Sequence, residues 1–236
     1  MLSNLPCVSY IKLRMALLAI VVLTQAIIVV LPYAAEDSVI KGFVLPLTPL
    51  KLSHLRVTSG AIRESPMGLL VVESPSMRAE ATMPTSDQAE LRFLYIGPTT
   101  EVAPLASGEL RRQVGLKLRA QDTCNVLYVM WHIEPDQRLA VSVKRNPGKS
   151  LHSQCGDRGY TNLQPRTARP LPSLEVGSTH ALRAAMREDR LVVFIDQQWV
   201  WEGPLSEQAL SLHGPVGLRS DNVRFDFELF IAEPLR

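Results

Sequence analysis

Hydrophobic and polar residues alternate in short segments along most of the chain. In residues 223–231 every odd-numbered position is apolar, whereas Arg224, Asp226 and Glu228 take three of the four even-numbered positions. Residues 139–143 repeat the alternation, with Leu or Val at each odd-numbered position. A period of two is typical of a strand that buries one face. We therefore predict half-buried strands at 139–143 and 223–231.

The remaining pattern predicts more strands and one short helix. Residues 191–195 are continuously apolar, and a polar turn separates them from a second apolar segment at 199–201, which predicts a hairpin. Residues 205–212 are expected to form a short helix that Ser206 caps. Turn-forming residues, including 17 Pro and 13 Gly, are spread along the chain. This punctuation predicts an all-β sandwich of two sheets. Further strands are expected at 91–96, 116–119, 125–133, 182–188 and 216–219.

Residues 15–35 form an apolar run without a charged side chain. A helix over this run would be roughly 30 Å long, which is one hydrocarbon thickness. Lys12 and Arg14 precede the run, and Glu36 and Asp37 follow it. Because basic flanks stay in the cytoplasm, we expect residues 1–14 to be cytoplasmic and the rest of the chain to lie in the periplasm or outside. We expect a single-pass, uncleaved signal anchor in the inner (cytoplasmic) membrane.

A cleavable signal peptide is the alternative, but its apolar region is normally shorter, at about 7–15 residues, and Tyr33 is bulky for the −3 position of a cleavage site. Within the run, Gln25 is a candidate contact with a neighbouring membrane helix, because a mid-membrane amide can bond across helices. Residues 36–56 are expected to be a Pro-rich apolar tether, and residues 57–236 the sandwich. Pro46 and Pro49 make the tether extended or an edge strand. It lies either along its own domain or against a neighbouring protein.

The balance of charges and the positions of the cysteines narrow the possible partners and metal sites further. The 25 Lys and Arg nearly balance the 23 Asp and Glu, which argues against a nucleic-acid partner. Cys124 and Cys155 both lie in the exported part, where oxidising conditions favour a disulfide. Two separate reduced thiols remain the alternative. No Cys-x-x-Cys or paired His spacing accompanies them, so we expect no metal site there.

Three pairs of strand motifs follow one another along the chain: residues 115–122 with 125–129, 177–183 with 190–196, and 214–222 with 223–227. In this order they resemble the concanavalin A-like lectin/glucanase jelly rolls, with the laminin-G-like and keto-disaccharide-hydrolase-like branches as the nearest. The resemblance covers residues 57–233 and implies a jelly-roll sandwich of two sheets. It says little about function, because this fold includes lectins, glycosidases and adhesion modules.

The resemblance also allows a test for catalysis. Glucanases of this fold use a Glu-x-Asp-x-x-Glu strand whose carboxylates flank the scissile bond. Here Glu134, Pro135 and Asp136 match in part, but position 139 is Leu. No nucleophile elbow, zinc motif or phosphate loop is present. We therefore expect no enzyme activity and no cofactor.

Recognition residues are expected in two places. The loop at 150–162 holds polar side chains around Cys155, and loops at one end of a sandwich often carry recognition. Trp199 and Trp201 are two residues apart, so we expect them to share a strand face and suit a sugar ring or a protein partner. The alternatives are a merely well-turned loop, a calcium site at Asp122 and Asp157, and core packing of the tryptophans. The candidate recognition residues are Asp157, Arg158, Tyr160, Asn162, Trp199 and Trp201.

Two functions remain open. The first is a non-catalytic accessory subunit of a larger membrane complex, favoured by Gln25 and the apolar tether. The alternative is a membrane-tethered, lectin-like module for periplasmic or cell-wall glycans, favoured by the fold and the tryptophan pair. A keto-sugar enzyme rests on family analogy alone. A sheet groove lined by aromatic and Asp or Asn side chains would favour a glycan, whereas a flat apolar patch continuous with the tether would favour a protein.

Overall fold

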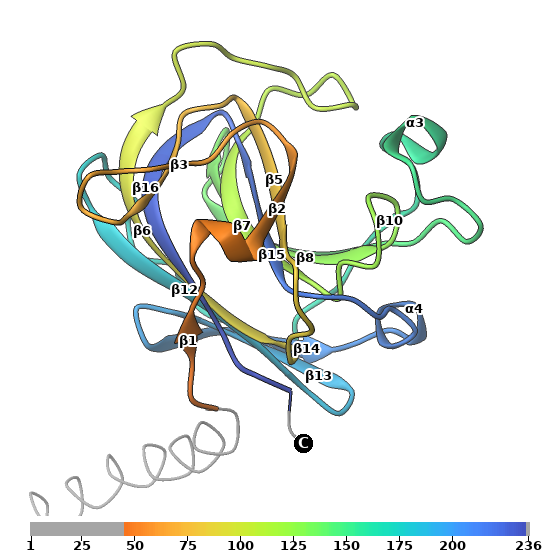
Figure 1. The fold of residues 1–236 in the computed structure, drawn as a ribbon. Helices are drawn as coiled ribbons and strands as arrows, with labels where there is room; N and C mark the ends of the chain where they lie inside the picture. Colours follow the sequence, from red (N-terminus) through yellow and green to blue (C-terminus); the bar gives the residue numbers. More distant parts are fainter. Residues whose placement is uncertain (1–44, 235–236) are drawn as a thin grey trace, which may run out of the picture. The chain divides into compact units, whose positions relative to one another are not determined.

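The structure is a computed structural model that describes residues 45–234. The expected anchor at 15–35, Gln25, and residues 36–44 of the expected tether lie outside the described residues. Within residues 45–234, no helix is long and apolar enough to cross a membrane. The described chain forms two antiparallel sheets stacked face to face (Figure 1). The expected sandwich is therefore present.

The first sheet has nine strands. Its centre is β6 paired with β16 on one side and with β12 on the other. In spatial order the strands are β11 (Thr167–Ala168), β14 (Gln198–Pro204), β13 (Arg190–Ile195), β12 (Thr179–Arg187), β6 (Gln88–Pro98), β16 (Val223–Ile231), β4 (Leu70–Val72) and β3 (Arg63–Glu64), and β1 (Thr48–Pro49) also pairs with β16.

The second sheet has seven strands. In spatial order they are β10 (Tyr160–Asn162), β9 (Arg138–Lys144), β8 (Val126–Glu134), β7 (Arg112–Leu118), β15 (Gly217–Asp221), β5 (Ser76–Ala81) and β2 (Leu55–Ser59). Three single-turn helices complete the described chain: η1 (Leu52–His54), α3 (His152–Cys155) and α4 (Glu207–Leu210).

The core lies between the sheets because each strand turns alternate side chains inward. On β8, Trp131 is fully buried and meets the ring of Phe93 from β6 edge to face at 6.1 Å. The ring of Phe225 on β16 also meets the Phe93 ring edge to face, with the ring centroids 6.3 Å apart. These buried aromatic contacts join the two sheets. The side chains that alternate with these and point outward from the seven-stranded sheet are largely polar.

Several elements match the expected ones. β16 spans Val223–Ile231, as the alternation predicted, and β13 and β14 form the expected hairpin. Ser206 caps α4 by accepting a hydrogen bond from the backbone of Ala209 at 3.2 Å. The strand β5 was not predicted, because its sequence SMRAEA mixes charged residues and alanine without a β-rich composition.

The described part of the expected tether belongs to the sandwich. Thr48 and Pro49 pair with the end of β16, and the backbone of Leu50 donates to Leu229 at 2.8 Å. β2 then begins at Leu55. Pro49 is tolerated because β1 pairs with one neighbouring strand and leaves its other edge free of ladder bonds, and Pro46 lies before the strand. Residues 45–56 thus lie along their own domain.

Candidate functional site

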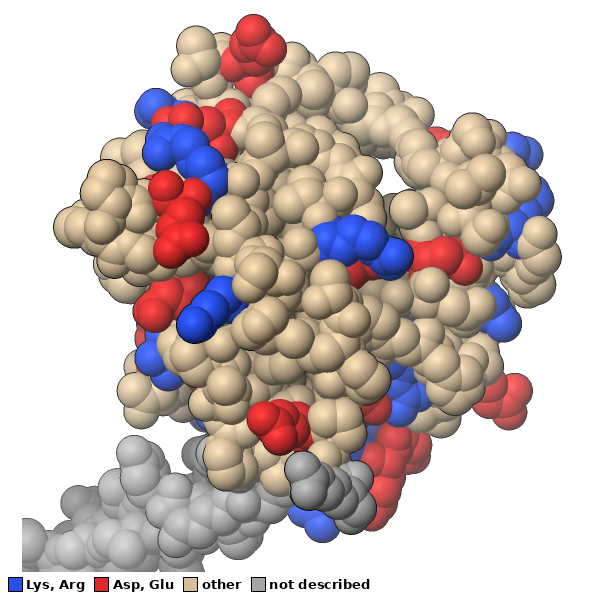
Figure 2. All heavy atoms as spheres, viewed as in Figure 1, with Lys and Arg blue, Asp and Glu red and all other residues tan. Residues whose placement is uncertain are grey.

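A groove of about 780 Å³ lies over the outer face of the seven-stranded sheet. We call it the polar groove. Its floor is formed by outward side chains of β5, β15, β7, β8 and β9. One rim is the segment 103–109, and the other is the loop 152–162 with α3. The space-filling view shows an opening beside the lobe that contains α3 (Figure 2).

Small residues in the floor make the sheet face hollow. Gly115 of β7 and Gly217 of β15 flank the centre of the floor, and Ala140 lies on β9. A Cβ atom on Gly115 would come within 2.1 Å of the carbonyl oxygen of Val129. The close approach of β7 and β8 therefore requires glycine at this position.

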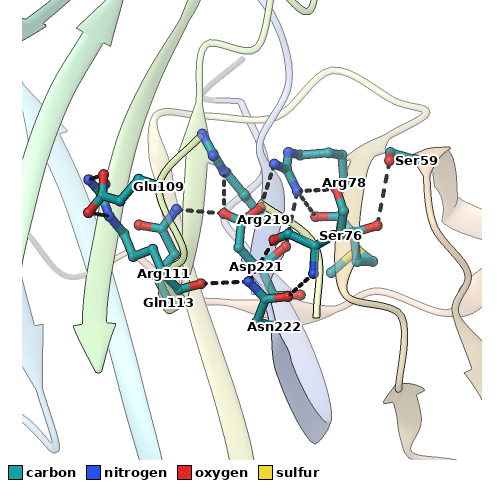
Figure 3. Close-up of polar contacts among 12 residues, drawn as sticks. Ser59, Ser76, Arg78, Glu109, Arg111, Gln113, Arg219, Asp221 and Asn222 are labelled. Atoms are coloured by element: carbon teal, nitrogen blue, oxygen red, sulfur yellow. Dashed lines mark hydrogen bonds and ion pairs between the residues drawn. The ribbon is translucent and has the colours of Figure 1, made fainter. Parts of the chain in front are cut away.

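At the centre of the floor, one buried carboxylate holds two arginines (Figure 3). One oxygen of Asp221 accepts a hydrogen bond from Arg78 Nη2 at 2.6 Å. The other oxygen accepts from Arg219 Nε at 2.9 Å and from Gln113 Nε2 at 2.5 Å. Burial alone would raise the pKa of Asp221, but the charges of Arg219 and Arg78 lower it below its usual value. The carboxylate is thus ionised and fixes both guanidinium groups, which we call the arginine pair.

The sheet register explains how residues remote in sequence meet here. Asp221 on β15 lies opposite Gln113 on β7 and Ser76 on β5. Two residues earlier on β15, Arg219 lies opposite Arg78. Positions two apart on a strand face the same side. The pairing of β15 between β5 and β7 therefore assembles the arginine pair.

A second ion pair lies at one end of the floor. Lys117 and Glu80 bond each other, and both side chains are about 2% exposed. Arg56 also donates to Glu80, at 2.8 Å. Burial lowers the pKa of Lys117 although Glu80 opposes the shift, and the pKa of Glu80 is lowered because Lys117 and Arg56 outweigh its burial. This pair neutralises its own charge.

Two tyrosines form an aromatic wall beside the arginine pair. The rings of Tyr128 and Tyr160 stack with centroids 6.0 Å apart and an interplanar angle of 24°. The guanidinium of Arg219 lies 5.0 Å from the Tyr128 ring, and its Nη1 donates to the Tyr160 hydroxyl at 3.3 Å. Tyr160 is 41% exposed. It offers a flat apolar surface with a polar edge to a ligand in the groove.

The disulfide expected between Cys124 and Cys155 is confirmed, and it fixes the loop that supplies Tyr160. Lys144 Nζ adds to this by donating to the carbonyl oxygens of Gly156 at 2.6 Å and Thr123 at 3.3 Å. Burial, and then the charges of Arg219 and Arg78, lower the pKa of Lys144 to about 8. The rim of the groove is therefore tied to the sheet by a covalent and a polar link.

The calcium alternative finds no support in the geometry. The carboxylate of Asp122 accepts hydrogen bonds from the backbone of Cys124 at 2.8 Å and from the side chain of Asn125. It therefore stabilises its own turn. Across residues 45–234, no group of three or more His, Cys, Asp or Glu side chains is placed to hold a metal ion.

The predicted recognition residues separate into two groups. Asp157, Tyr160 and Asn162 line the polar groove. Arg158 is exposed and is not among the residues that line the groove. All the predicted recognition residues lie after residue 150, and yet the floor of the groove comes from β5, β7, β8, β9 and β15.

The tryptophans lie in the other sheet. Trp201 is buried in the core at 3% exposure, whereas Trp199 is half-buried with the guanidinium of Arg169 over its ring at 4.7 Å. The prediction that they share a face is wrong. The register shifts between Val193 and Phe194, so the two tryptophans oppose successive residues of β13. Such a bulge turns residues two apart to opposite faces.

The sequence reasoning missed the arginine pair, Gln113 and Asp221. Charged residues that alternate on a strand look the same whether the face is a binding groove or plain solvent-exposed surface. One signal could have helped: Gly217 lies within the predicted strand 216–219, Gly115 directly precedes the predicted strand 116–119, and a glycine within a strand often marks a close approach.

A hydrogen-bonded chain of Ser178, His180 and Asp196 lies in the nine-stranded sheet. His180 Nδ1 is 2.7 Å from Asp196, and its Nε2 is 2.9 Å from the Ser178 hydroxyl. The order resembles a nucleophilic triad, but the Ser178 hydroxyl donates to the carbonyl of Glu175 at 2.6 Å. The serine therefore closes the turn before β12, and the three residues are not part of the polar groove.

Comparison of the sequence with protein-family models and with curated proteins finds no match. Comparison of the fold with solved structures finds similar ones. A carbohydrate-binding module from Bacillus subtilis aligns with a TM-score of 0.51 at 13% identity, over 74% of this chain and 91% of that chain. A putative glycosyl hydrolase from Parabacteroides distasonis also aligns with a TM-score of 0.51, at 12% identity over 80% of this chain and 100% of that chain.

Proposed function

We propose that this protein, a sandwich of the concanavalin A-like jelly-roll class, is a carbohydrate-binding module whose binding site is the polar groove. The observation that carries the proposal is the stacked Tyr128–Tyr160 wall beside hydrogen-bonding side chains in one groove. Sugar rings present apolar C–H faces that pack on aromatic rings, and their hydroxyls need polar partners. The similarity of the fold to that of a carbohydrate-binding module also supports a glycan ligand. We propose binding without catalysis.

The side chains that line the groove favour a glycan over a protein partner. The groove is lined by aromatic side chains together with Asp157 and Asn162, which favours a glycan. The aromatic residues are tyrosines and not the expected tryptophans. The described part of the tether packs on its own domain, so it gives no support to an accessory-subunit role. The signal anchor at 15–35 stays part of the proposal and would hold the module on the outer side of the inner membrane.

The test is a glycan array with the full chain in mild detergent. We expect binding that Tyr160→Ala weakens at least tenfold, because this change removes the exposed half of the aromatic wall. Trp199→Ala, in the other sheet, serves as the control and should bind as the wild type does. Both variants must keep the wild-type unfolding transition. Loss of binding in Trp199→Ala alone would place the site on the other sheet, and absence of any bound glycan would refute the proposal.

A further inference from the structure

The charges of the polar groove do not cancel. Six Lys and Arg side chains line it against three Asp and Glu side chains. Lys117 is neutralised by Glu80, and Arg111 is paired with Glu109. The remaining groups leave a positive surplus at the floor, where two guanidinium groups share one carboxylate.

The arginine pair is half neutralised and firmly held. Asp221 contributes one negative charge against the two positive charges of Arg78 and Arg219. The side chain of Arg219 is only 10% exposed, and that of Arg78 is 20% exposed. Within residues 45–234, Nη2 of Arg219 has no hydrogen-bond partner, since Nε and Nη1 make its polar contacts. A poorly hydrated guanidinium with open donors favours a charged acceptor over water.

Neighbouring groups respond to the same positive field. The pKa of His152 at the rim is lowered by its burial and then by the charges of Lys144, Arg78 and Arg219. The exposed Asp157 opposes this field, because its charge raises the pKa values of both His152 and Lys144. Lys144 donates to two carbonyl groups. Because carbonyl groups carry no net charge, the positive charge of Lys144 is not neutralised by these bonds. It adds to the positive charge that an anionic ligand would meet in the groove.

We infer that the polar groove selects an acidic sugar, with a ring carboxylate bound by Arg78 and Arg219 and the sugar ring against Tyr160. The inference rests on the proposed function and specifies its ligand class. The terminal nitrogens of Arg78 donate to Asp221, Ser76 and the carbonyl groups of Met77 and Ser220, which leaves Nη2 of Arg219 as the open donor. A carboxylate that accepts from this nitrogen supplies the single negative charge that the arginine pair lacks. Gln113 lies beside the pair, and its Oε1 is buried without a hydrogen-bond partner in the described chain, so a sugar hydroxyl could donate to it.

The test compares an oligogalacturonate with its carboxyl-reduced counterpart, which has the same linkage and no charge. The full chain in mild detergent is titrated with each by calorimetry. We expect at least tenfold tighter binding of the charged form, and a loss of this preference as sodium chloride rises from 50 to 500 mM. A sulfated neutral oligosaccharide of equal length forms the third arm. If it binds more tightly than the oligogalacturonate, the groove is a sulfate site and the carboxylate inference is wrong.

Single substitutions test which side chains cause the preference for a charged sugar. Arg78→Gln should weaken oligogalacturonate binding by tenfold or more and leave the carboxyl-reduced form within twofold. Arg219→Gln should weaken oligogalacturonate binding by tenfold or more, and it should weaken the carboxyl-reduced form less, because Arg219 also contacts Tyr128 and Tyr160. Arg63→Gln, at an exposed ion pair of the other sheet, is the matched control and should change neither. If Arg219→Gln does not fold, the more exposed Arg78→Gln keeps the test open. Tyr160-dependent binding without preference for charge would overturn this inference and leave the proposed function intact, whereas binding of no glycan would overturn both.

Discussion

His132 shows how one residue of the groove depends on its surroundings. It lies opposite Gln113 on the neighbouring strand and is 4% exposed. Burial, and then the charges of Arg111, Arg138 and Arg219, lower the pKa of His132 to about 3. Asp221 opposes this shift but does not reverse it. The imidazole is therefore neutral in the folded protein at any physiological pH.

This pKa predicts a dependence of stability on pH. The unfolded chain binds a proton at His132 near pH 6.5, and the folded chain near pH 3. Between these values the unfolded state binds more protons, so stability rises with pH and falls on acidification. From pH 7 to pH 4.5, we expect the wild type to lose about 2 kcal/mol more unfolding free energy than His132→Gln. Urea denaturation of both proteins at the two pH values measures this, and equal losses would contradict it.

At the level of elements, the disulfide-linked loop controls the rim of the groove. Cys155 ends α3, and Tyr160 begins β10 five residues later. We expect Cys124→Ser with Cys155→Ser to lower the unfolding free energy by about 3 kcal/mol, from the loss of one cross-link. The same variant should bind glycan more weakly, because Tyr160 is less well fixed. Urea denaturation and glycan titration measure the two effects. Cys7→Ser is the control, and an unchanged double variant would refute the role of the loop.

The elements differ in how far the sequence alone could predict them. The alternation in β16 and the cap at Ser206 are local, so pattern and capping rules were sufficient. The pairing of the two cysteines was predicted from the oxidising compartment that we expect for this part of the chain. The bulge between Val193 and Phe194 depends on strand pairing, and that is why the faces of the tryptophans were mispredicted. The arginine pair depends on the register of β15 between β5 and β7, which no local pattern contains.

For the whole molecule, we propose that residues 15–35 remain as a membrane anchor. Carbonate extraction of native membranes should leave the full chain in the pellet. Val22→Arg with Ile27→Arg should move it to the soluble fraction, because each charge at mid-membrane costs on the order of 3 kcal/mol. Lys51→Arg, a change outside the run, is the control. A wild-type chain that is soluble and shortened at its N-terminus, as measured by intact mass, would show a cleaved signal instead.

The pairing of β1 with β16 has a mechanical consequence for such an anchored protein. Tension between a held ligand and the N-terminal anchor would enter the sandwich through β1, which is two residues long. A short edge strand peels bond by bond, so β1 would detach before β2, which belongs to the sheet that forms the groove. Release of residues 45–54 would lengthen the connection by roughly 30 Å. The first strand would thus act as an extensible link that yields under load while the binding sheet keeps its shape.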